Sequence, residues 1–349
     1  MKILIKGPAQ SYAMRNIILI IITTLGFNSA LLAQDPHFSQ YFSSPLTLNP
    51  ANTGNFEGPG RLAMNFRNQW QGIGEPFITG TASFDTDIFK SKTGKGNKFS
   101  LGVIGLYDRT TAGKLTSNYF GTSLAYHILT NNSAEKTSKL SIGFQTSLAN
   151  RRLDFTKITF EDQFTSYGFD LSLPNNQNFG TSNISYVDFN TGLMYTESSE
   201  NGSFYIGTSL YHITQPKESF LNDQTNRVPM RLTLHSGATI MTGELSSLIL
   251  SGLVMNQAAS TSIVAGLAYS KQIDSKFDDI RVMAGAWYRN KDAVIPYVGY
   301  IYNNFQMGLT YDVNTSTLST ANSRYRSFEL SLIYTFLDKS EYKRYVPWY

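Results

Sequence analysis

The chain of 349 residues contains no cysteine and only four histidines. Without cysteine it can form neither disulfides nor thiolate metal sites. Beyond residue 33 no run of 18 consecutive apolar residues occurs, which excludes helical membrane spans. Charged residues make up only 15% of the chain, whereas 21 Tyr and 23 Phe are present. The composition favours a fold that uses many aromatic side chains and few charges.

An apolar run at residues 17–33 follows Met14 and Arg15. A basic residue before such a run predicts a secretory signal peptide, here residues 1–33, with cleavage after Ala33. A transmembrane anchor is the alternative, but the run is short and no stop-transfer charges follow it. Removing the segment takes away three positive charges and no negative one, so the formal net charge falls from +4 to +1. Nothing in this charge indicates a nucleic-acid partner.

A two-residue alternation recurs from about residue 61 to the C-terminus, and residues 140–148 show it clearly. Leu140, Ile142, Phe144, Thr146 and Leu148 share one face, and Ser141, Gly143, Gln145 and Ser147 share the other. Side chains alternate sides along a strand, so the segment has one apolar face and one small or polar face. Repeated segments of this kind predict a transmembrane β-barrel with an apolar outside and a polar inside. A β-sandwich is the alternative, but it does not need so many consecutive amphipathic strands.

The pattern predicts an all-β outer-membrane barrel of fourteen antiparallel strands. An even count places both termini on the periplasmic side, and most of the long loops then fall outside. The barrel is expected over residues 61–337, after an irregular segment at 34–60 and before a tail at 338–349. The expected strands are 61–68, 77–85, 98–107, 115–129, 138–149, 186–196, 203–213, 230–242, 247–255, 261–271, 280–289, 293–302, 304–313 and 325–337.

The predicted inward face is rich in glycine and serine, including Gly143, Gly192 and Gly207. Glycines let strands curve, and they can also leave room for a plug or peptide in the lumen. We expect only a few charged side chains on the inward face. Pores for bulk ions carry rings of charge, so this scarcity disfavours such a pore. The main inward charges expected are Asp188, Asp312, Glu329 and Arg289.

The outer loop at 150–185 is the longest irregular segment of the predicted barrel. Loops of this length are usually functional or disordered, and its aromatic content argues against simple disorder. The loop either folds over the barrel mouth or forms a contact surface for an extracellular partner. The candidate contact residues are Phe155, Phe160, Phe164, Tyr167, Phe169 and Phe179.

The four histidines are not expected to converge on the fourteen-strand map, which argues against a metal site or a catalytic triad. The topology is also expected to bring no His–Asp or Ser–His pair together. We therefore predict no enzyme activity, no catalytic residue and no cofactor.

The segment 34–60 has turn signals rather than a strand pattern. Pro36, Pro45 and the run Asn49–Gly54 break regular structure, while several aromatic and leucine side chains still require packing partners. We expect this segment to close the periplasmic side of the barrel or to fill its lumen.

Three motifs in and after this segment resemble the PorP/SprF family of Bacteroidetes outer-membrane proteins. Their order and spacing directly after a signal peptide are specific, and the barrel pattern extends the resemblance over the rest of the mature chain. The first is Asp35, Pro36, Phe38, Ser39, Gln40 and Tyr41; the second is Asn49, Pro50, Ala51 and Gly54; the third is Arg67, Asn68, Gln69 and Trp70.

The resemblance implies a role in the type IX secretion system and in gliding motility. It implies a secreted cargo with a type B C-terminal domain as partner, along with periplasmic lipoproteins or a peptidoglycan-binding protein. The leading hypothesis is a cargo-binding secretion accessory that anchors its cargo at the cell surface. An outer-membrane transporter for small or apolar solutes is the main alternative, and a purely structural link to periplasmic motor parts is a third. The motif polar groups would hold irregular backbone or contact the cargo directly.

Overall fold

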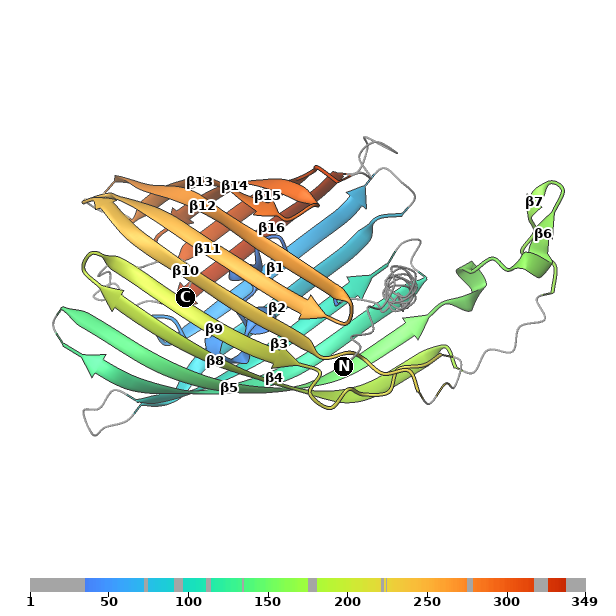
Figure 1. Cartoon of the computed structure of the whole chain (residues 1–349), viewed down its shortest axis with the longest axis horizontal. Helices are drawn as coiled ribbons and strands as arrows, with labels where there is room; N and C mark the ends of the chain where they lie inside the picture. Colours follow the sequence, from blue (N-terminus) through green and yellow to red (C-terminus); the bar gives the residue numbers. More distant parts are fainter. Residues whose placement is uncertain are drawn as a thin grey trace, which may run out of the picture.

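Fourteen antiparallel strands close into a barrel in the computed structural model, and β1 pairs with β16 to complete the ring (Figure 1). The structure describes residues 35–71, 75–90, 97–110, 114–133, 135–174, 181–220, 223, 225–274, 279–316 and 326–336, and the predicted signal peptide and tail lie outside this part. The barrel strands are β1 (Gly60–Gln71), β2 (Phe77–Lys90), β3 (Lys98–Arg109), β4 (Leu115–Asn132), β5 (Lys136–Leu153), β8 (Asn183–Ser199), β9 (Gly202–Tyr211), β10 (Arg231–Gly243), β11 (Ser246–Gln257), β12 (Ser260–Asp274), β13 (Ile280–Arg289), β14 (Ala293–Tyr302), β15 (Phe305–Asn314) and β16 (Arg326–Phe336).

Each of the fourteen predicted strands corresponds to one barrel strand, so the predicted fold class is confirmed. The largest differences in length are at β5 and β8, whose ladder continues as far as Arg152 and Asn183. In contrast, β9 ends two residues earlier than predicted because His212 adopts a positive φ of 57° that turns the chain out of the ladder.

The alternation divides most strands as predicted. On β5, Leu140, Ile142 and Phe144 are between 37% and 46% exposed on the outer surface, whereas Ser141 is fully buried in the lumen. An apolar outer band on a closed barrel is suited to lipid, since no strand edge is left unpaired in the membrane. Within the described residues, no helix has the length and hydropathy needed to cross a bilayer.

In the sector β11–β14, the expectation of a small or polar inside is wrong for β11, β13 and β14. Large apolar side chains also point inward there, so these strands are apolar on both faces. They pack with residues of the N-terminal segment in one buried cluster. Its inward members include Leu253, Met283, Trp287, Ile295, Tyr297 and Ile301.

The two ends of the barrel differ in the length of their connections. The end where β1 begins and β16 finishes carries short turns, such as residues 200–201, 244–245 and 303–304. The other end carries the long connections 154–182 and 212–230. Outer-membrane barrels have short periplasmic turns and longer extracellular loops, so we call these ends the periplasmic end and the outer mouth.

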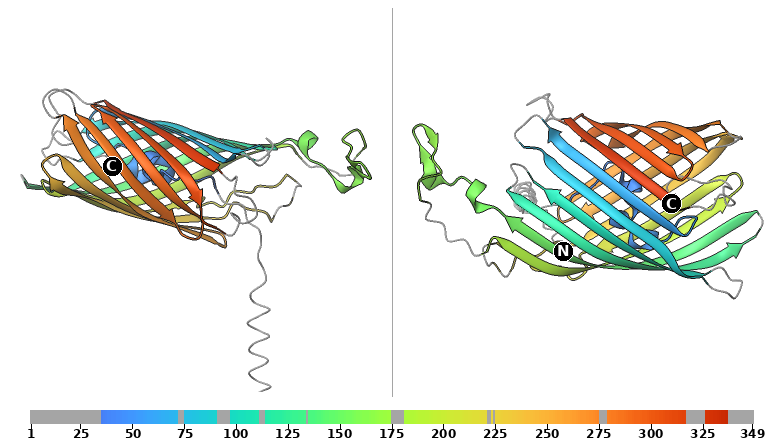
Figure 2. Two further views of the ribbon diagram at one scale, coloured as in Figure 1. Left: turned by 90° about the horizontal axis from the view of Figure 1, so that it is seen from above. Right: turned by 180° about the vertical axis from the view of Figure 1, so that it is seen from behind.

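The part of the connection 154–182 at residues 154–174 extends away from the barrel beyond the outer mouth (Figures 1 and 2). It contains the 3₁₀ helices η4 (Phe155–Lys157) and η5 (Glu161–Gln163) and a small hairpin of β6 (Phe164–Thr165) and β7 (Gly168–Phe169). The described part of this connection does not fold over the barrel mouth, and its role as a contact surface for an extracellular partner stays a prediction.

Residues 35–56 lie inside the barrel, where Figure 2 shows them as a blue coil surrounded by strands, and residues 57–59 lead into β1. This lumen segment contains η1 (Tyr41–Ser43), α2 (Pro45–Leu48) and η2 (Pro50–Asn52). Pro45 and Pro50 occupy the first positions of their helices, where a missing N–H costs nothing. The side chain of Asn49 accepts a hydrogen bond from the Ala51 N–H at 2.8 Å and so caps η2.

Candidate functional site

The lumen segment begins at the outer mouth, where Asp35 is held by three wall residues. Its carboxylate lies 2.7 Å from His212 Nε2 and 3.0 Å from Arg231 Nη1, and its N–H donates to Gln257 at 2.9 Å. On its other side, His212 Nδ1 is 2.9 Å from Asp188. Asp35 and Asp188 therefore flank one histidine, so the expectation that no His–Asp pair forms is wrong.

This pairing has two structural causes. Tyr211 points into the lumen, so a regular strand would point His212 outward; its positive φ turns the ring inward, where it is 5% exposed. Asp35 comes from the lumen segment, whose path has no sequence periodicity.

The two groups at this contact shift each other's protonation. Burial alone would lower the pKa of His212, but the Asp35 and Asp188 carboxylates outweigh it and raise the pKa to about 9. Burial would likewise raise the pKa of Asp35, but His212 and Arg231 hold that pKa well below its usual range. The contact is therefore an ion pair at neutral pH.

A second set of wall charges binds the next part of the lumen segment. Arg67 and Arg289 both contact Asp312, at 3.0 and 2.9 Å. Asp312 also accepts a hydrogen bond from the Ser39 hydroxyl at 2.8 Å, and Arg67 donates to the His37 carbonyl. Burial and the neighbouring Arg67 and Arg289 lower the pKa of His37 to about 3, so its ring is neutral.

Glu329 binds the turn of the lumen segment at Ser39 and Gln40. Its carboxylate accepts the backbone N–H groups of Ser39 at 2.7 Å and Gln40 at 2.9 Å, and the Asn65 amide at 3.1 Å. The Gln40 side chain is fully buried; it donates to the Glu329 carbonyl at 3.0 Å and accepts from the Ser331 hydroxyl at 2.7 Å. A buried carboxylate is stabilised by such converging N–H donors.

The middle of the segment packs against the apolar sector. The Phe42 ring centroid lies 5.1 Å from that of Trp287 and 5.7 Å from that of Tyr297. The Tyr41 hydroxyl donates to Ser251 at 2.8 Å. These contacts account for aromatic residues in a segment without a strand pattern.

Close contact with the next part of the segment explains two lumen glycines. A Cβ on Gly192 would lie 1.8 Å from Asn49 Oδ1, and one on Gly143 would lie 2.2 Å from the Pro50 backbone. Asn49 is fully buried and donates to the carbonyls of Leu193 and Thr208, both at 3.1 Å. At these two positions, glycine leaves room for a peptide in the lumen, which is one of the two roles that the sequence left open.

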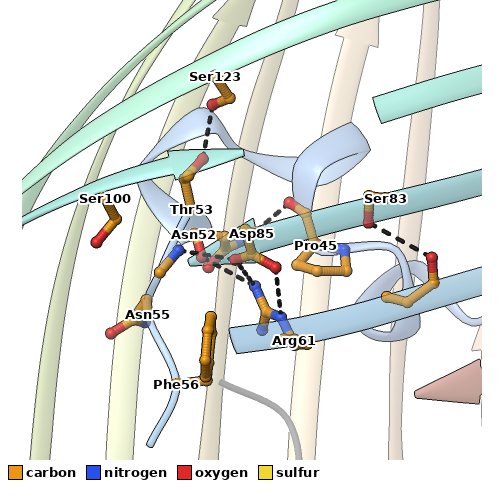
Figure 3. Close-up of polar contacts among 12 residues, drawn as sticks. Pro45, Asn52, Thr53, Asn55, Phe56, Arg61, Ser83, Asp85, Ser100 and Ser123 are labelled. Carbon is orange, nitrogen blue, oxygen red and sulfur yellow. Dashed lines mark hydrogen bonds and ion pairs between the residues drawn. The ribbon is translucent and has the colours of Figure 1, made fainter. Parts of the chain in front are cut away.

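The periplasmic end of the segment is bound by Arg61 and Asp85, which lie 2.8 Å apart and are almost fully buried (Figure 3). Asp85 accepts the Gly54 N–H at 2.7 Å, and Arg61 donates to the Asn52 carbonyl at 3.0 Å. The Thr53 hydroxyl is 2.6 Å from that of Ser123 (Figure 3). Wall side chains thus bind the segment at both ends.

These contacts correct the expected number of inward charges. The lumen wall also carries charges at positions beyond the four expected ones, and each has the same parity along its strand as neighbouring inward polar residues. Counting every charged residue at an inward position of the alternation would therefore have found them. They include Arg61, Arg67, Asp85, Asp87, Lys98, Asp108, Lys139, Arg151 and Arg231.

The first two motifs lie wholly in the lumen segment, and the third is divided between lumen and outer rim. Phe38, Tyr41 and Pro50 are buried. Arg67 is buried in the wall, whereas Asn68 and Gln69 are half-buried and Trp70 is 39% exposed. These last three residues line the rim.

Two further features mark the outer mouth. A cavity of about 630 Å³, here called the vestibule, lies between the lumen segment and the rim, and an adjoining chamber of about 70 Å³ lies against β3, β4, β5, β8 and β9. The vestibule is lined by residues including Asp35, Trp70, Asp108, Tyr119 and Arg151. Its size is in the range of ligand-binding pockets.

The aromatic residues predicted for partner contact lie beyond the vestibule on the projecting connection. Tyr167 is fully exposed, and Phe164 and Phe169 are 63% and 54% exposed, with ring centroids 4.9 Å apart. Phe155 and Phe160 lie nearer the barrel in or beside the 3₁₀ helices, and Phe179 lies outside the described residues.

No group of three or more His, Asp or Glu side chains in the described residues is arranged to hold a metal ion. The fold and the lumen together define a membrane β-barrel that contains its own N-terminal segment. The family model described as "Type IX secretion system membrane protein PorP/SprF" matches residues 30–334, and the chain belongs to this family. The predicted resemblance is thereby confirmed.

No curated protein matches the sequence. Among solved structures, the Ralstonia pickettii toluene transporter TbuX is similar at a TM-score of 0.44 and 10% identity, over 83% of this chain and 92% of that one. A Pseudomonas aeruginosa FadL homologue is similar at a TM-score of 0.43 and 9% identity, over 83% of this chain and 93% of that one. A Rhodopseudomonas blastica porin mutant is similar at a TM-score of 0.31 and 10% identity, over 79% of this chain and 98% of that one. These scores are too low to carry an argument, so the fold is established by the strand pairing itself.

Proposed function

We propose that this protein is a non-enzymatic accessory of type IX secretion that binds one secreted cargo at the outer mouth and anchors it at the cell surface. The observation that supports this is the arrangement of the two ends. The lumen segment occupies the barrel, while the vestibule and the aromatic hairpin β6–β7 face outward. Exposed aromatic side chains are common binding anchors at protein interfaces.

The family resemblance supplies the kind of cargo. It implies a large secreted protein, such as a gliding adhesin, that carries a type B C-terminal domain. We place the barrel in the outer membrane, reached with a cleaved signal peptide, and expect periplasmic lipoproteins or a peptidoglycan-binding protein at its other end. The buried motif groups Gln40, Asn49 and Arg67 would then act on the cargo only indirectly, through the lumen segment that they hold.

The test is a pull-down of the tagged full-length protein from its native outer membrane in a gentle detergent, followed by mass spectrometry. One large surface protein, recovered at near-equal abundance through its C-terminal domain, is the expected result. A matched variant that lacks residues 164–169 should recover less of it while still assembling as a barrel. Recovery of the barrel alone, from a preparation in which other membrane complexes survive, would refute the proposal and favour a transporter.

A further inference from the structure

One buried carboxylate in the wall differs from the others in its partners. Asp85 contacts Arg61, Asp87 contacts Lys98, and Asp312 contacts two arginines. Asp188 contacts His212, and Glu329 accepts three N–H donors. Asp108 is only 9% exposed, yet within the described residues it has a single hydrogen bond, from the Thr79 hydroxyl at 2.7 Å, and no ion pair.

Asp108 lies in the wall of the vestibule, at the outer end of β3. The wall cations two strands away on either side are already engaged: Arg151 binds Glu218 and the Ser117 hydroxyl, and Arg67 binds Asp312. Buried charges in proteins are normally paired, because removal from water is costly without a counter-charge. The wall of the vestibule therefore carries a carboxylate that forms no ion pair of its own, although the engaged Arg151 lines the same cavity.

Backbone strain at the same cavities is a second observation. Six described residues other than glycine have positive φ. Ala258, Lys291 and Asn303 lie in tight hairpin turns, where such angles are ordinary. Gln215 (φ 46°) lies in the connection 212–230. Trp70 (φ 62°), on the vestibule, lies where the β1–β16 register shifts, and His212 (φ 57°), on the chamber, directly follows β9. Strained residues of this kind concentrate at ligand sites.

The chemistry of the lining selects the class of ligand. A calcium ion takes six to eight oxygen ligands, and no group of three acidic or histidine side chains among the described residues is arranged to hold a metal ion. An ammonium or guanidinium group needs only one carboxylate, and its apolar stem can pack on aromatic rings. Trp70, Phe77 and Tyr119 line the same cavity.

We propose that the vestibule is a socket for a lysine or arginine side chain of the secreted partner, with Asp108 as its counter-ion. This rests on the proposed function, because it assumes that a secreted protein docks at the outer mouth. It adds a specific requirement: the docked segment carries a basic residue that enters the vestibule.

The primary test compares Asp108→Asn with Glu244→Gln in the full-length protein purified from its native membrane. Glu244 is an exposed acid in the β10–β11 turn at the periplasmic end, so its substitution removes the same charge far from the vestibule. Asp108→Asn is expected to lower recovery of the surface partner by about tenfold, because it removes one member of a desolvated charge pair. Glu244→Gln should recover as much partner as the wild type.

A stability measurement separates recognition from structure. Asparagine can still accept the Thr79 hydrogen bond and carries no charge, so the thermal midpoint of the barrel should stay the same or rise. A fall in midpoint that accompanies the loss of partner would show that Asp108 is structural, which would overturn the socket. Unchanged recovery with Asp108→Asn would also overturn it while leaving the proposed function intact.

Cross-linking identifies the occupant directly. A photoreactive benzoylphenylalanine in place of Tyr119, which lines both cavities, should label a partner peptide with a lysine or arginine beside the attachment point. Replacing that basic residue by glutamine should lower recovery as much as Asp108→Asn does, and the two losses should not add. A labelled peptide without a basic residue, or a cross-link to the chain's own loops, would refute the socket. If the wild type recovers no surface protein, the proposed function fails and the socket fails with it.

Discussion

Arg61 and Asp85 face each other across the β1–β2 ladder, 2.8 Å apart, and each also binds the backbone of the lumen segment. The pair therefore joins the barrel wall to the segment at its periplasmic end. Both charged side chains are buried, so the contact is sensitive to the loss of either charge.

We predict that Asp85→Asn loosens this end of the segment. Breaking a buried ion pair by removing one partner costs about 3–5 kcal/mol, since the remaining charge stays buried. The thermal midpoint in detergent should fall, and conductance in planar bilayers should rise. Glu197→Gln is the matched control, because the Lys136–Glu197 pair is 42% and 31% exposed and such pairs contribute about 0–1 kcal/mol. Equal behaviour of the two variants would contradict the prediction.

A methyl group at Gly192 should displace the lumen segment at Asn49. The added Cβ would lie 1.8 Å from Asn49 Oδ1, and overpacking of this kind costs about 1–3 kcal/mol. The control is Gly105→Ala on β3, where the added Cβ would meet no atom within 4 Å. Thermal unfolding should separate the two variants; if Gly192→Ala is as stable as Gly105→Ala, the segment does not pack on β8 as described.

The contact between Asp35 and His212 should make stability depend on pH. The pKa of His212 is raised to about 9 from 6.5. Its contribution to the free energy of unfolding is therefore complete below pH 6.5 and is lost as the pH rises through about 9. Asp35 has a lowered pKa, so its contribution is present above its ordinary value of 3.8 and is lost only in acid. The pair is therefore fully formed in weakly acidic solution.

The measurement is the difference in thermal midpoint between wild type and His212→Gln across this range. Glutamine carries no charge, so the difference should be largest near pH 6 and should shrink toward zero above about pH 9, where the histidine is neutral. Titrating groups that do not contact His212 affect both proteins equally and cancel. A difference that does not change with pH would argue against an ion pair at this site.

The aromatic hairpin should contribute to partner binding and not to barrel stability. Tyr167 is fully exposed, so Tyr167→Ala should leave the thermal midpoint unchanged. If the hairpin contacts the cargo, the same variant should lower recovery of the surface partner, by about tenfold where the ring is an interface anchor. Tyr300→Ala, on the outward face of β14, offers a comparison with an aromatic residue far from the mouth. Equal recovery with both variants would remove Tyr167 from the contact surface.

The barrel was predictable because its signal is local and repeated. A two-residue alternation needs no knowledge of distant contacts, so all fourteen strands could be placed. The prediction failed inside β11–β14, because apolar residues such as Trp287 and Tyr297 face a lumen that another segment fills. Alternation identifies the two faces of a strand but does not say what lies against each of them.

The candidate site was harder to predict because it is built from irregular backbone. The motif residues of the lumen segment were recognised by resemblance, but their partners, such as Glu329 for Gln40, lie on distant strands. His212 was assigned to a regular strand, and only its positive φ brings it to Asp188 and Asp35. Neither the path of residues 35–59 nor a single left-handed residue leaves a periodic trace in the sequence.

The position of the lumen segment has a consequence for the order of assembly. Its contacts join residues far apart in the chain: Gln40 to Glu329 spans 289 positions, and Asn49 to His235 spans 186. The contact with Glu329 can form only after nearly the whole chain has emerged, and such distant pairings are intrinsically slow. The segment also leads directly into β1, which forms the seam with β16. Closure of the seam and enclosure of the segment are therefore coupled late steps in the biogenesis of this protein.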